Sequence, residues 1–247
     1  MKKIDSNGPV LEAVSVDVFS TWNNHIQIAG IDWKVLPGEF WLIGGPHGSG
    51  KTDLLMTAAG LRRPAAGSMQ VFGREPARMS ETELLQLRTR LGFVFKGGGR
   101  MFNELTVAEN VSLALCYHRN WPVEQAWDEV RAVLEITELA PMAGETAQQL
   151  GEDWQQRVGL ARALALKPEV LFLDEPAAGL EARHCQWWRD FLEQLSAGGP
   201  GSGGRKVTVI AATNDFAPWL GESRRYALIK DHRWQLLGEQ SGHPKID

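Results

Sequence analysis

Residues 45–52 have the residue types and spacing of a phosphate-binding loop, Gly-Pro-His-Gly-Ser-Gly-Lys-Thr. An apolar run, 40–43, precedes this loop and a helix-favouring run, 53–59, follows it, which argues against a simple Gly/Pro turn with an incidental lysine. Glycines let backbone N–H groups close around an anion, and a helix start directs unpaired donors and the positive dipole end at it. The predicted nucleotide-binding residues are Gly45, Pro46, His47, Gly48, Ser49, Gly50, Lys51, Thr52 and Asp53.

Two side chains of this loop have more specific predicted roles. We expect the ammonium of Lys51 to contact the β- and γ-phosphates of the nucleotide, and the hydroxyl of Thr52 to bind Mg²⁺. The sequence therefore predicts a site for a nucleoside triphosphate with its metal ion.

A pair of carboxylates follows a second apolar run. Asp174 and Glu175 come directly after residues 170–173. Strand ends of this kind lie beside the phosphates in parallel α/β sheets. We predict that Asp174 holds Mg²⁺ through water and that Glu175 polarises a water for in-line attack on the γ-phosphate. The alternative, a solvated pair of acids at a strand end, does not explain why they accompany a phosphate loop.

Size and composition set broad limits on the class of protein. The chain has 247 residues, 43% of them hydrophobic, which suits one large α/β domain or a core with a subdomain. A net charge of −4 argues against broad polyanion binding, so we expect no nucleic-acid partner. Two distant cysteines, Cys116 and Cys185, favour a reducing compartment over a disulfide framework. No apolar run approaches the roughly 18 residues of a spanning helix, so we expect a soluble chain that reaches a membrane through a partner.

The order of predicted elements indicates an α/β core interrupted by helices. Capping boxes predict helix starts at Ser80 and Thr106, and Pro122 fits a first helical position. We expect residues 1–96 and 166–247 to form an α/β core with an antiparallel β-subdomain, and 97–165 an inserted helical subdomain. Strands are expected within 10–35 and at 40–43, 69–73, 91–95, 170–173, 207–211, 226–229 and 234–237; further helices are expected at 53–59, at 154–166 and around 187–195.

Three strings downstream of the phosphate loop carry a family resemblance. They are Gln-Gln-Arg-Val-Gly-Leu-Ala-Arg-Ala-Leu at 155–164, Pro168, and Leu-Asp-Glu-Pro at 173–176. With these strings the chain resembles the ATP-binding subunits of ABC transporters over nearly its full length. The resemblance implies a P-loop NTPase fold with a RecA-like core, a single ATP-binding domain over 1–247, ATP and Mg²⁺ as cofactors, and transport-coupled ATP hydrolysis. It also implies two partners, an integral-membrane permease and a second ATP-binding subunit of the same or a different chain. The expected location is cytoplasmic, on the inner face of the cell membrane.

Two finer expectations also come from the resemblance. The segments 95–102 and 105–111 look like the lipid-trafficking (Mla/Mce-type) branch, which implies a lipid cargo. In this family an aromatic residue near the start of the domain stacks on adenine, and the spacing from Gly38 places Trp22 there, with Phe19 as the alternative. Packing of Trp22 against the β-subdomain is the competing interpretation.

The chain departs from the family at its signature loop. The family has Leu-Ser-Gly-Gly-Gln, whereas this chain has Leu150-Gly151-Glu152-Asp153-Trp154. The family's glycines let a helix N-terminus approach the γ-phosphate of the partner's ATP. Glu152 and Asp153 place carboxylates there, and each like-charge pair at about 4 Å costs on the order of 4 kcal/mol near a surface. The alternative is that these acids cap the helix and satisfy its dipole.

Three more positions differ from the family. A glutamine that helps to hold Mg²⁺ is Lys96, which can pair with a phosphate oxygen but cannot bind the metal while protonated. A histidine near the γ-phosphate is Asn214, which can donate a hydrogen bond but cannot become a cation. An aspartate becomes Glu181, the mildest change. We therefore expect nucleotide binding with Glu175, Asn214 and Lys96 as the catalytic set, and slow turnover; the alternative is a pseudo-ATPase that serves as a nucleotide-binding scaffold or regulatory module.

Overall fold

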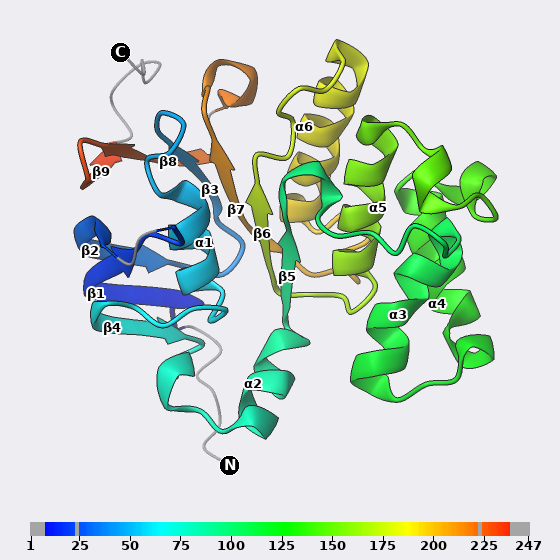
Figure 1. The fold of residues 1–247 in the computed structure, drawn as a ribbon, viewed down its shortest axis with the longest axis horizontal. Helices are drawn as coiled ribbons and strands as arrows, with labels where there is room; N and C mark the ends of the chain where they lie inside the picture. Colours follow the sequence, from blue (N-terminus) through cyan, green and yellow to red (C-terminus); the bar gives the residue numbers. More distant parts are fainter. Residues whose placement is uncertain (1–7, 23–24, 222–223, 238–247) are drawn as a thin grey trace. The chain divides into compact units, whose positions relative to one another are not determined.

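A computed structural model describes residues 8–22, 25–221 and 224–237 (Figure 1). The chain forms two compact units. The first comprises residues 1–84 and 208–247, and the second comprises residues 85–207. Among the described residues, no helix combines the length and the apolar character that crossing a membrane requires.

The first unit is built on a mixed sheet in the order β4-β1-β2-β9-β8-β3-β7. β1 pairs antiparallel with β2 and β4, as predicted for a β-subdomain, and β3 pairs in parallel with both β7 and β8. The predicted closing hairpin is the antiparallel pair of β8 and β9. The strands are β1 (Leu11–Phe19), β2 (Ile26–Val35), β3 (Phe40–Gly44), β4 (Ala66–Val71), β7 (Thr208–Thr213), β8 (Arg224–Lys230) and β9 (Arg233–Leu237).

The buried strand β3 positions the phosphate loop. All five of its residues are buried, as expected for an apolar strand with a parallel neighbour on each side. Helix α1 (Lys51–Ala58) follows the loop and packs against β1, β4 and β7. The ring of Phe216 fills the space beside Gly44, where a Cβ atom would lie 2.2 Å from the ring. The strand-loop-helix order predicted from the sequence is therefore present.

The second unit contains the predicted helices and one pair of parallel strands. β5 (Leu91–Val94) and β6 (Val170–Asp174) pair in parallel. Helix α3 packs against α4 and α5, and α5 also contacts β5. The helices are α3 (Val107–Arg119), α4 (Val123–Ile136), α5 (Glu152–Leu164) and α6 (Ala182–Ala197); α2 (Glu81–Arg88) spans the boundary of the two units. The predicted α/β fold with inserted helices is confirmed.

Helix starts follow local side-chain chemistry. At α3 the hydroxyl of Thr106 accepts the N–H of Glu109, whose carboxylate in turn accepts the N–H of Thr106. These hydrogen bonds lower the pKa of Glu109. The predicted start of the next helix is one residue early: Pro122 is extended, with ψ 154°, and its carbonyl accepts the N–H groups of Gln125 and Ala126, so α4 begins at Val123.

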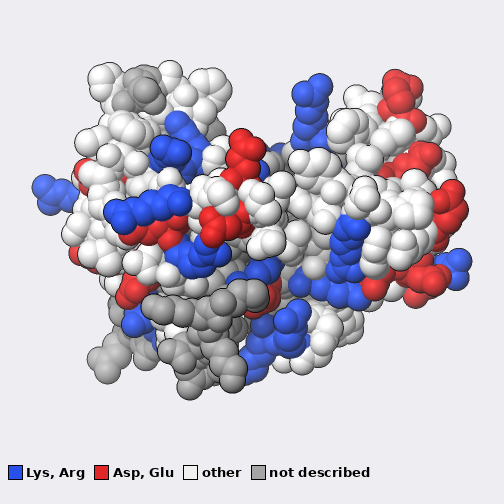
Figure 2. All heavy atoms as spheres, turned by 90° about the horizontal axis from the view of Figure 1, so that it is seen from below, with Lys and Arg blue, Asp and Glu red and all other residues white. Residues whose placement is uncertain are grey.

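Charged side chains of both signs are interspersed on the face of the molecule that Figure 2 shows. Within the second unit, Arg90 forms an ion pair with Glu169, and Lys167 forms one with Glu129. The full sequence has similar numbers of basic (26) and acidic (30) residues.

Candidate nucleotide-binding site

The phosphate loop connects β3 to α1 and leaves the start of the helix without a side-chain cap. Gly50 is the N-cap residue, in the left-handed region with φ 99°, and no side chain caps the helix there. A Cβ atom on Gly50 would lie 2.6 Å from Cγ of Gln27, whose amide donates to the carbonyl of Gly48 at 2.7 Å. Only glycine fits this position, and the arrangement directs the first-turn N–H groups of α1 toward the loop, where they suit an anion.

Lys51 is the buried cation of this loop. Its side chain reaches back across the loop, and Nζ donates to the carbonyls of Gly45 (2.9 Å) and Pro46 (3.1 Å). Nζ also donates to Oδ1 of Asn214 at 2.7 Å. Gly44 pairs with Thr213 across β3 and β7, so the loop and Asn214 follow the same edge of the sheet. The structure therefore brings together two predicted site residues, and this contact was not predicted.

The remaining predicted residues of the loop differ in their surroundings. Thr52 is exposed at the first turn of α1, and a hydroxyl oxygen is a ligand of the kind that hard divalent cations bind. Pro46, His47 and Gly48 are exposed, whereas Gly45 is buried. The glycine cradle, the buried ammonium and the exposed hydroxyl fit the triphosphate and the hard divalent cation that the sequence predicts.

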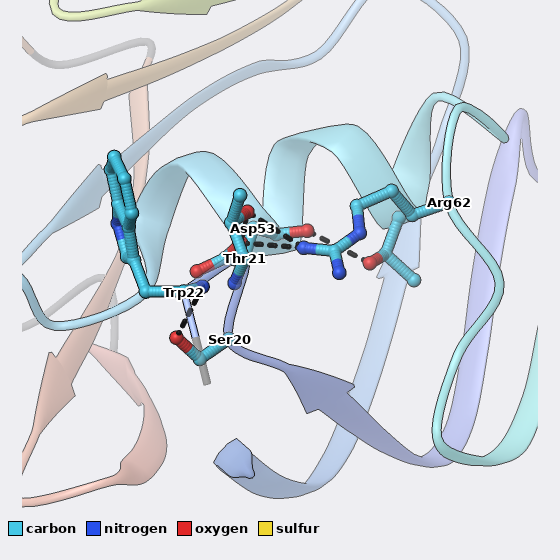
Figure 3. A network of polar contacts seen from close by, with 6 residues as sticks. Ser20, Thr21, Trp22, Asp53 and Arg62 are labelled. Atoms are coloured by element: carbon cyan, nitrogen blue, oxygen red, sulfur yellow. Dashed lines mark hydrogen bonds and ion pairs between the residues drawn. The ribbon is translucent and has the colours of Figure 1, made fainter. Parts of the chain in front are cut away.

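Asp53 does not point its carboxylate at the loop. Oδ1 accepts the backbone N–H of Thr21 (3.0 Å), the hydroxyl of Thr21, and Nη1 of Arg62 (2.9 Å) (Figure 3). Nη1 of Arg62 also donates to the Thr21 hydroxyl at 2.7 Å. The sequence analysis did not predict roles for Thr21 and Arg62. The signal for them was Asp53 itself, because an acid in the first turn of a phosphate-binding helix needs a nearby cation to offset its repulsion of the phosphates.

Trp22 follows this network along the chain. Its side chain is 92% exposed, so packing against the β-subdomain does not explain it. Its backbone N–H donates to Oγ of the buried Ser20 at 3.2 Å. The aromatic ring is available to a flat ligand, and its contact with adenine stays a prediction.

In the second unit, three predicted residues follow one edge of the β5–β6 pair. Val94 pairs with Leu173, so Lys96 on one strand end and Asp174 and Glu175 on the other leave the pair at the same edge. Asp174 is 5% exposed and Lys96 is exposed. The backbone of Glu175 lies in the left-handed region, with φ 53°. Non-glycine residues adopt this conformation at a cost, but several described residues outside the predicted site share it, so the role of Glu175 stays a prediction.

The turn that carries Lys96 is fixed to helix α5. Gly98 (φ 79°) lies against the helix so closely that a Cβ atom there would come within 2.3 Å of the carbonyl of Gln155. A Cβ atom on Gly159 would lie 2.6 Å from Cα of Gly98. The turn that carries Lys96 therefore packs tightly against helix α5 within the second unit.

The signature acids do not cap α5. Gly151 is the N-cap residue and no side chain caps the helix there, so the capping part of the alternative is wrong; both acids do lie in the first turn, where they suit the helix dipole. Instead, Oδ2 of Asp153 lies 3.4 Å from Nε2 of His184, which is 1% exposed. Burial lowers the pKa of His184; Asp153 opposes this shift and Arg157 adds to it.

Arg157 holds this cluster together from the next turn of α5. Its guanidinium lies 4.6 Å from the ring centre of Trp154 and 3.8 Å from that of Trp187. Nη1 donates to Glu138 at 2.7 Å, and Nη2 contacts Nδ1 of His184 at 3.3 Å. The side chain of Arg157 is only 4% exposed, and burial lowers its pKa.

Among the described residues, Asp153, Glu181 and His184 approach one another as metal ligands do, with ligand atoms within 4.8 Å. The chemistry of the group does not fit a metal ion. Arg157 can only donate, so Nδ1 of His184 must accept and the neutral ring carries its proton on Nε2. A metal needs the lone pair of that nitrogen and a proton on the other one. Among the described residues, Nδ1 of His184 is hydrogen-bonded to Arg157, whereas Nε2 lies 3.4 Å from Asp153 without forming a hydrogen bond.

A phosphate loop of this form on a β3–α1 junction, beside parallel strands, defines the class as a P-loop nucleotide-binding protein. A family model described as ABC transporter matches residues 28–178, and the chain belongs to that family. The fold agrees with the dimeric post-hydrolysis structure of the ATP-binding cassette MJ0796 bound to ADP and Pi (TM-score 0.79, 25% identity, covering 92% of this chain and 99% of that chain).

Curated relatives include two import proteins. The sulfate/thiosulfate import ATP-binding protein CysA of Mycolicibacterium paratuberculosis is 32% identical over 90% of this chain. The spermidine/putrescine import ATP-binding protein PotA of Trichodesmium erythraeum is 31% identical over 90% of this chain. This chain spans only 58% and 55% of the lengths of those relatives. Their names do not support the lipid-trafficking branch that residues 95–111 indicated.

Proposed function

We propose that this chain is the ATP-binding subunit of an ABC transporter, which binds Mg-ATP and couples its binding and hydrolysis to a membrane permease. The observation that carries the proposal is the phosphate loop, which brings together a buried ammonium, glycines in positive-φ conformations and an uncapped helix start. The family match supports the same function.

The proposed roles follow the sequence predictions. Residues 45–52 and Trp22 bind the nucleotide, with Lys51 on the phosphates, whereas the carboxylate of Asp53 is engaged by Thr21 and Arg62. Thr52 and Asp174 are the proposed Mg²⁺ ligands; the ion supplies positive charge that neutralises the phosphates. Glu175 polarises the attacking water, and Lys96 and Asn214 contact the γ-phosphate. The contact of Asn214 with Lys51 supports a place for this amide near the phosphates.

The partners of this proposal are a permease and a second ATP-binding subunit. The MJ0796 cassette was solved as a dimer with ADP and Pi, which supports a paired arrangement here. We propose that residues 1–247 act as one ATP-binding domain on the inner face of the membrane, and that the helical subdomain 97–165 transmits closure to the permease. The import proteins among the relatives favour a small charged solute over a lipid as cargo.

A second candidate function is nucleotide binding with negligible turnover. It is favoured by Glu152, exposed at the start of α5, and by Asp153, which is engaged with His184. Both acids stand where the family presents glycines to the partner's ATP. In this case the chain serves as a scaffold or regulatory module.

Steady-state phosphate release from Mg-ATP, measured with the purified chain alone and with its permease, separates the two candidates. The transport ATPase requires release above a Lys51→Ala control, because the control lacks the phosphate-binding ammonium. The scaffold requires ATP binding with release equal to that control. Absence of ATP binding contradicts both.

A further inference from the structure

The turn that carries Trp22 is tied to the phosphate-binding helix by a single carboxylate. Oδ1 of Asp53 accepts two donors from Thr21 and one from Arg62 (Figure 3). Thr21 is separated from Asp53 by 32 residues in the sequence, whereas Asp53 is only two residues from Lys51. The network therefore connects a segment after β1 directly to the first turn of α1.

The environment of Asp53 identifies it as a structural anion rather than a phosphate ligand. A bare carboxylate in the first turn of α1 would repel a polyphosphate bound there. Arg62 compensates that charge, because its guanidinium folds back to Asp53 from beyond the end of α1 and both side chains are largely buried (24% and 11% exposed). The backbone N–H of Arg62 is itself held by the carbonyl of Met56 at 3.2 Å. The pair leaves no net charge beside the phosphates.

The orientation of the Trp22 ring depends on the hydrogen bonds that hold residues 20–22 to Asp53. The ring is 92% exposed, so core packing does not orient it. Its position is set by the backbone of residues 20–22, which is held by the Thr21 N–H on Asp53, by the Trp22 N–H on Ser20, and by the Ser20 N–H on the carbonyl of His25 (2.8 Å). Of these contacts, only the one to Asp53 reaches the phosphate-binding helix.

We infer that Asp53, together with Arg62, is a positioning residue that sets the distance between the base-binding ring of Trp22 and the phosphate loop. The inference rests on the proposed function, since it assigns Trp22 to the purine base. Asp53 thus couples recognition of the base to recognition of the phosphates. Loss of the anchor frees the ring and leaves the phosphate cradle in place.

The test compares Mg-ATP with Mg-tripolyphosphate, which has the phosphates and lacks the base. Dissociation constants are measured by calorimetry for the wild type, Trp22→Ala, Asp53→Ala and the double variant. We expect Asp53→Ala to weaken ATP binding by about five- to tenfold relative to tripolyphosphate binding, because a stacked base contributes at that scale and the charge left on Arg62 acts on both ligands alike. The double variant should bind ATP no more weakly than Trp22→Ala, because Asp53 acts through Trp22.

Thr21→Val keeps the Asp53–Arg62 pair and removes only the hydroxyl, so we expect a smaller loss of ATP affinity in the same direction. This variant keeps the inference testable if Asp53→Ala does not fold. The control is Arg78→Gln, which changes an exposed ion pair with Glu75 in the same unit and should alter neither constant. The inference is overturned if Asp53→Ala weakens both ligands equally, or if the losses of the two single variants add. A wild type that binds neither ligand contradicts the proposed function instead.

Discussion

Two helices of this chain begin after a glycine with no side-chain cap, and they differ in the charge of their first turn. Helix α1 follows Gly50, and its first turn carries Lys51 and an Asp53 compensated by Arg62. Helix α5 follows Gly151 and carries Glu152 and Asp153. Both helix starts have backbone donors for an anion, but only the first lacks uncompensated acids. This difference in charge is the physical basis for our proposal that the chain binds nucleotide at the first helix start and that the acids at the second slow turnover.

The largest effect is expected from removing the proposed catalytic carboxylate. Glu175→Gln keeps the shape of the side chain and abolishes its basicity, so hydrolysis should fall by about 100-fold or more. ATP should stay bound longer, because binding depends on the first helix start. Single-turnover hydrolysis and the release of bound ATP measure the two effects. Glu135→Gln, in an exposed position of α4, is the control, and equal hydrolysis by both variants removes Glu175 from the catalytic set.

The next effect concerns the stability of the region around α5. Arg157→Leu removes the guanidinium from between Trp154 and Trp187 and leaves Nδ1 of His184 without its donor. The free energy of unfolding should fall by about 2 kcal/mol, less than for a fully buried pair because Glu138 is 59% exposed. Urea denaturation followed by circular dichroism measures the change. Arg183→Gln, at a side chain that is 73% exposed, should change stability little; equal losses in both variants count against the stacked arrangement.

A smaller effect is expected from making the second helix start resemble the first in charge. Replacing both Glu152 and Asp153 by glycine removes two carboxylates, and ATP turnover by the chain with its partner subunit should rise about three- to tenfold. A parallel variant, Glu152→Gln with Asp153→Asn, removes the charge without adding backbone freedom. If repulsion suppresses turnover, both variants accelerate phosphate release. An unchanged or slower rate in both shows that these acids do not limit the reaction.

The smallest effect is a pH dependence of stability. Burial holds the pKa of His184 below its ordinary value of 6.5, and burial together with Arg88 does the same for His118. The unfolded chain therefore binds more protons than the folded chain as the pH falls below about 6.5, so these groups destabilise the fold there. His184→Gln should flatten the decline in unfolding free energy between about pH 7 and pH 5. An unchanged slope contradicts a buried neutral imidazole.

The sequence was most informative where local chemistry decides the structure. The glycine spacing around Lys51 and the Thr106–Glu109 capping box each need only neighbouring residues, and both are present in the structure. Other contacts join segments that lie 9 to 163 residues apart in the sequence. These are the contacts of Asp53 with Thr21 and Arg62 and the contact of Lys51 with Asn214. No periodicity or spacing encodes such contacts. The same limit explains why the contact of Asp153 was not predicted: its neighbour His184 comes from α6.

The roles of the site residues stay predictions that depend on binding of the nucleotide itself. Trp22, Lys96 and Glu175 were selected from the sequence by position in a pattern. The structure adds the exposure of the Trp22 ring and the positive φ of Glu175, which the sequence alone does not reveal. Sequence could not supply these properties because both depend on how the surrounding backbone folds.

Calorimetric titration of the folded chain with Mg-ATP tests the central claim most directly, because that claim assigns phosphate binding to the loop around Lys51. We predict saturable binding of one nucleotide per chain, weakened by at least about 100-fold in Lys51→Ala, which loses a charge-assisted contact with the phosphates. Absence of binding heat at several temperatures, or equal affinity in the Lys51→Ala variant, would contradict it.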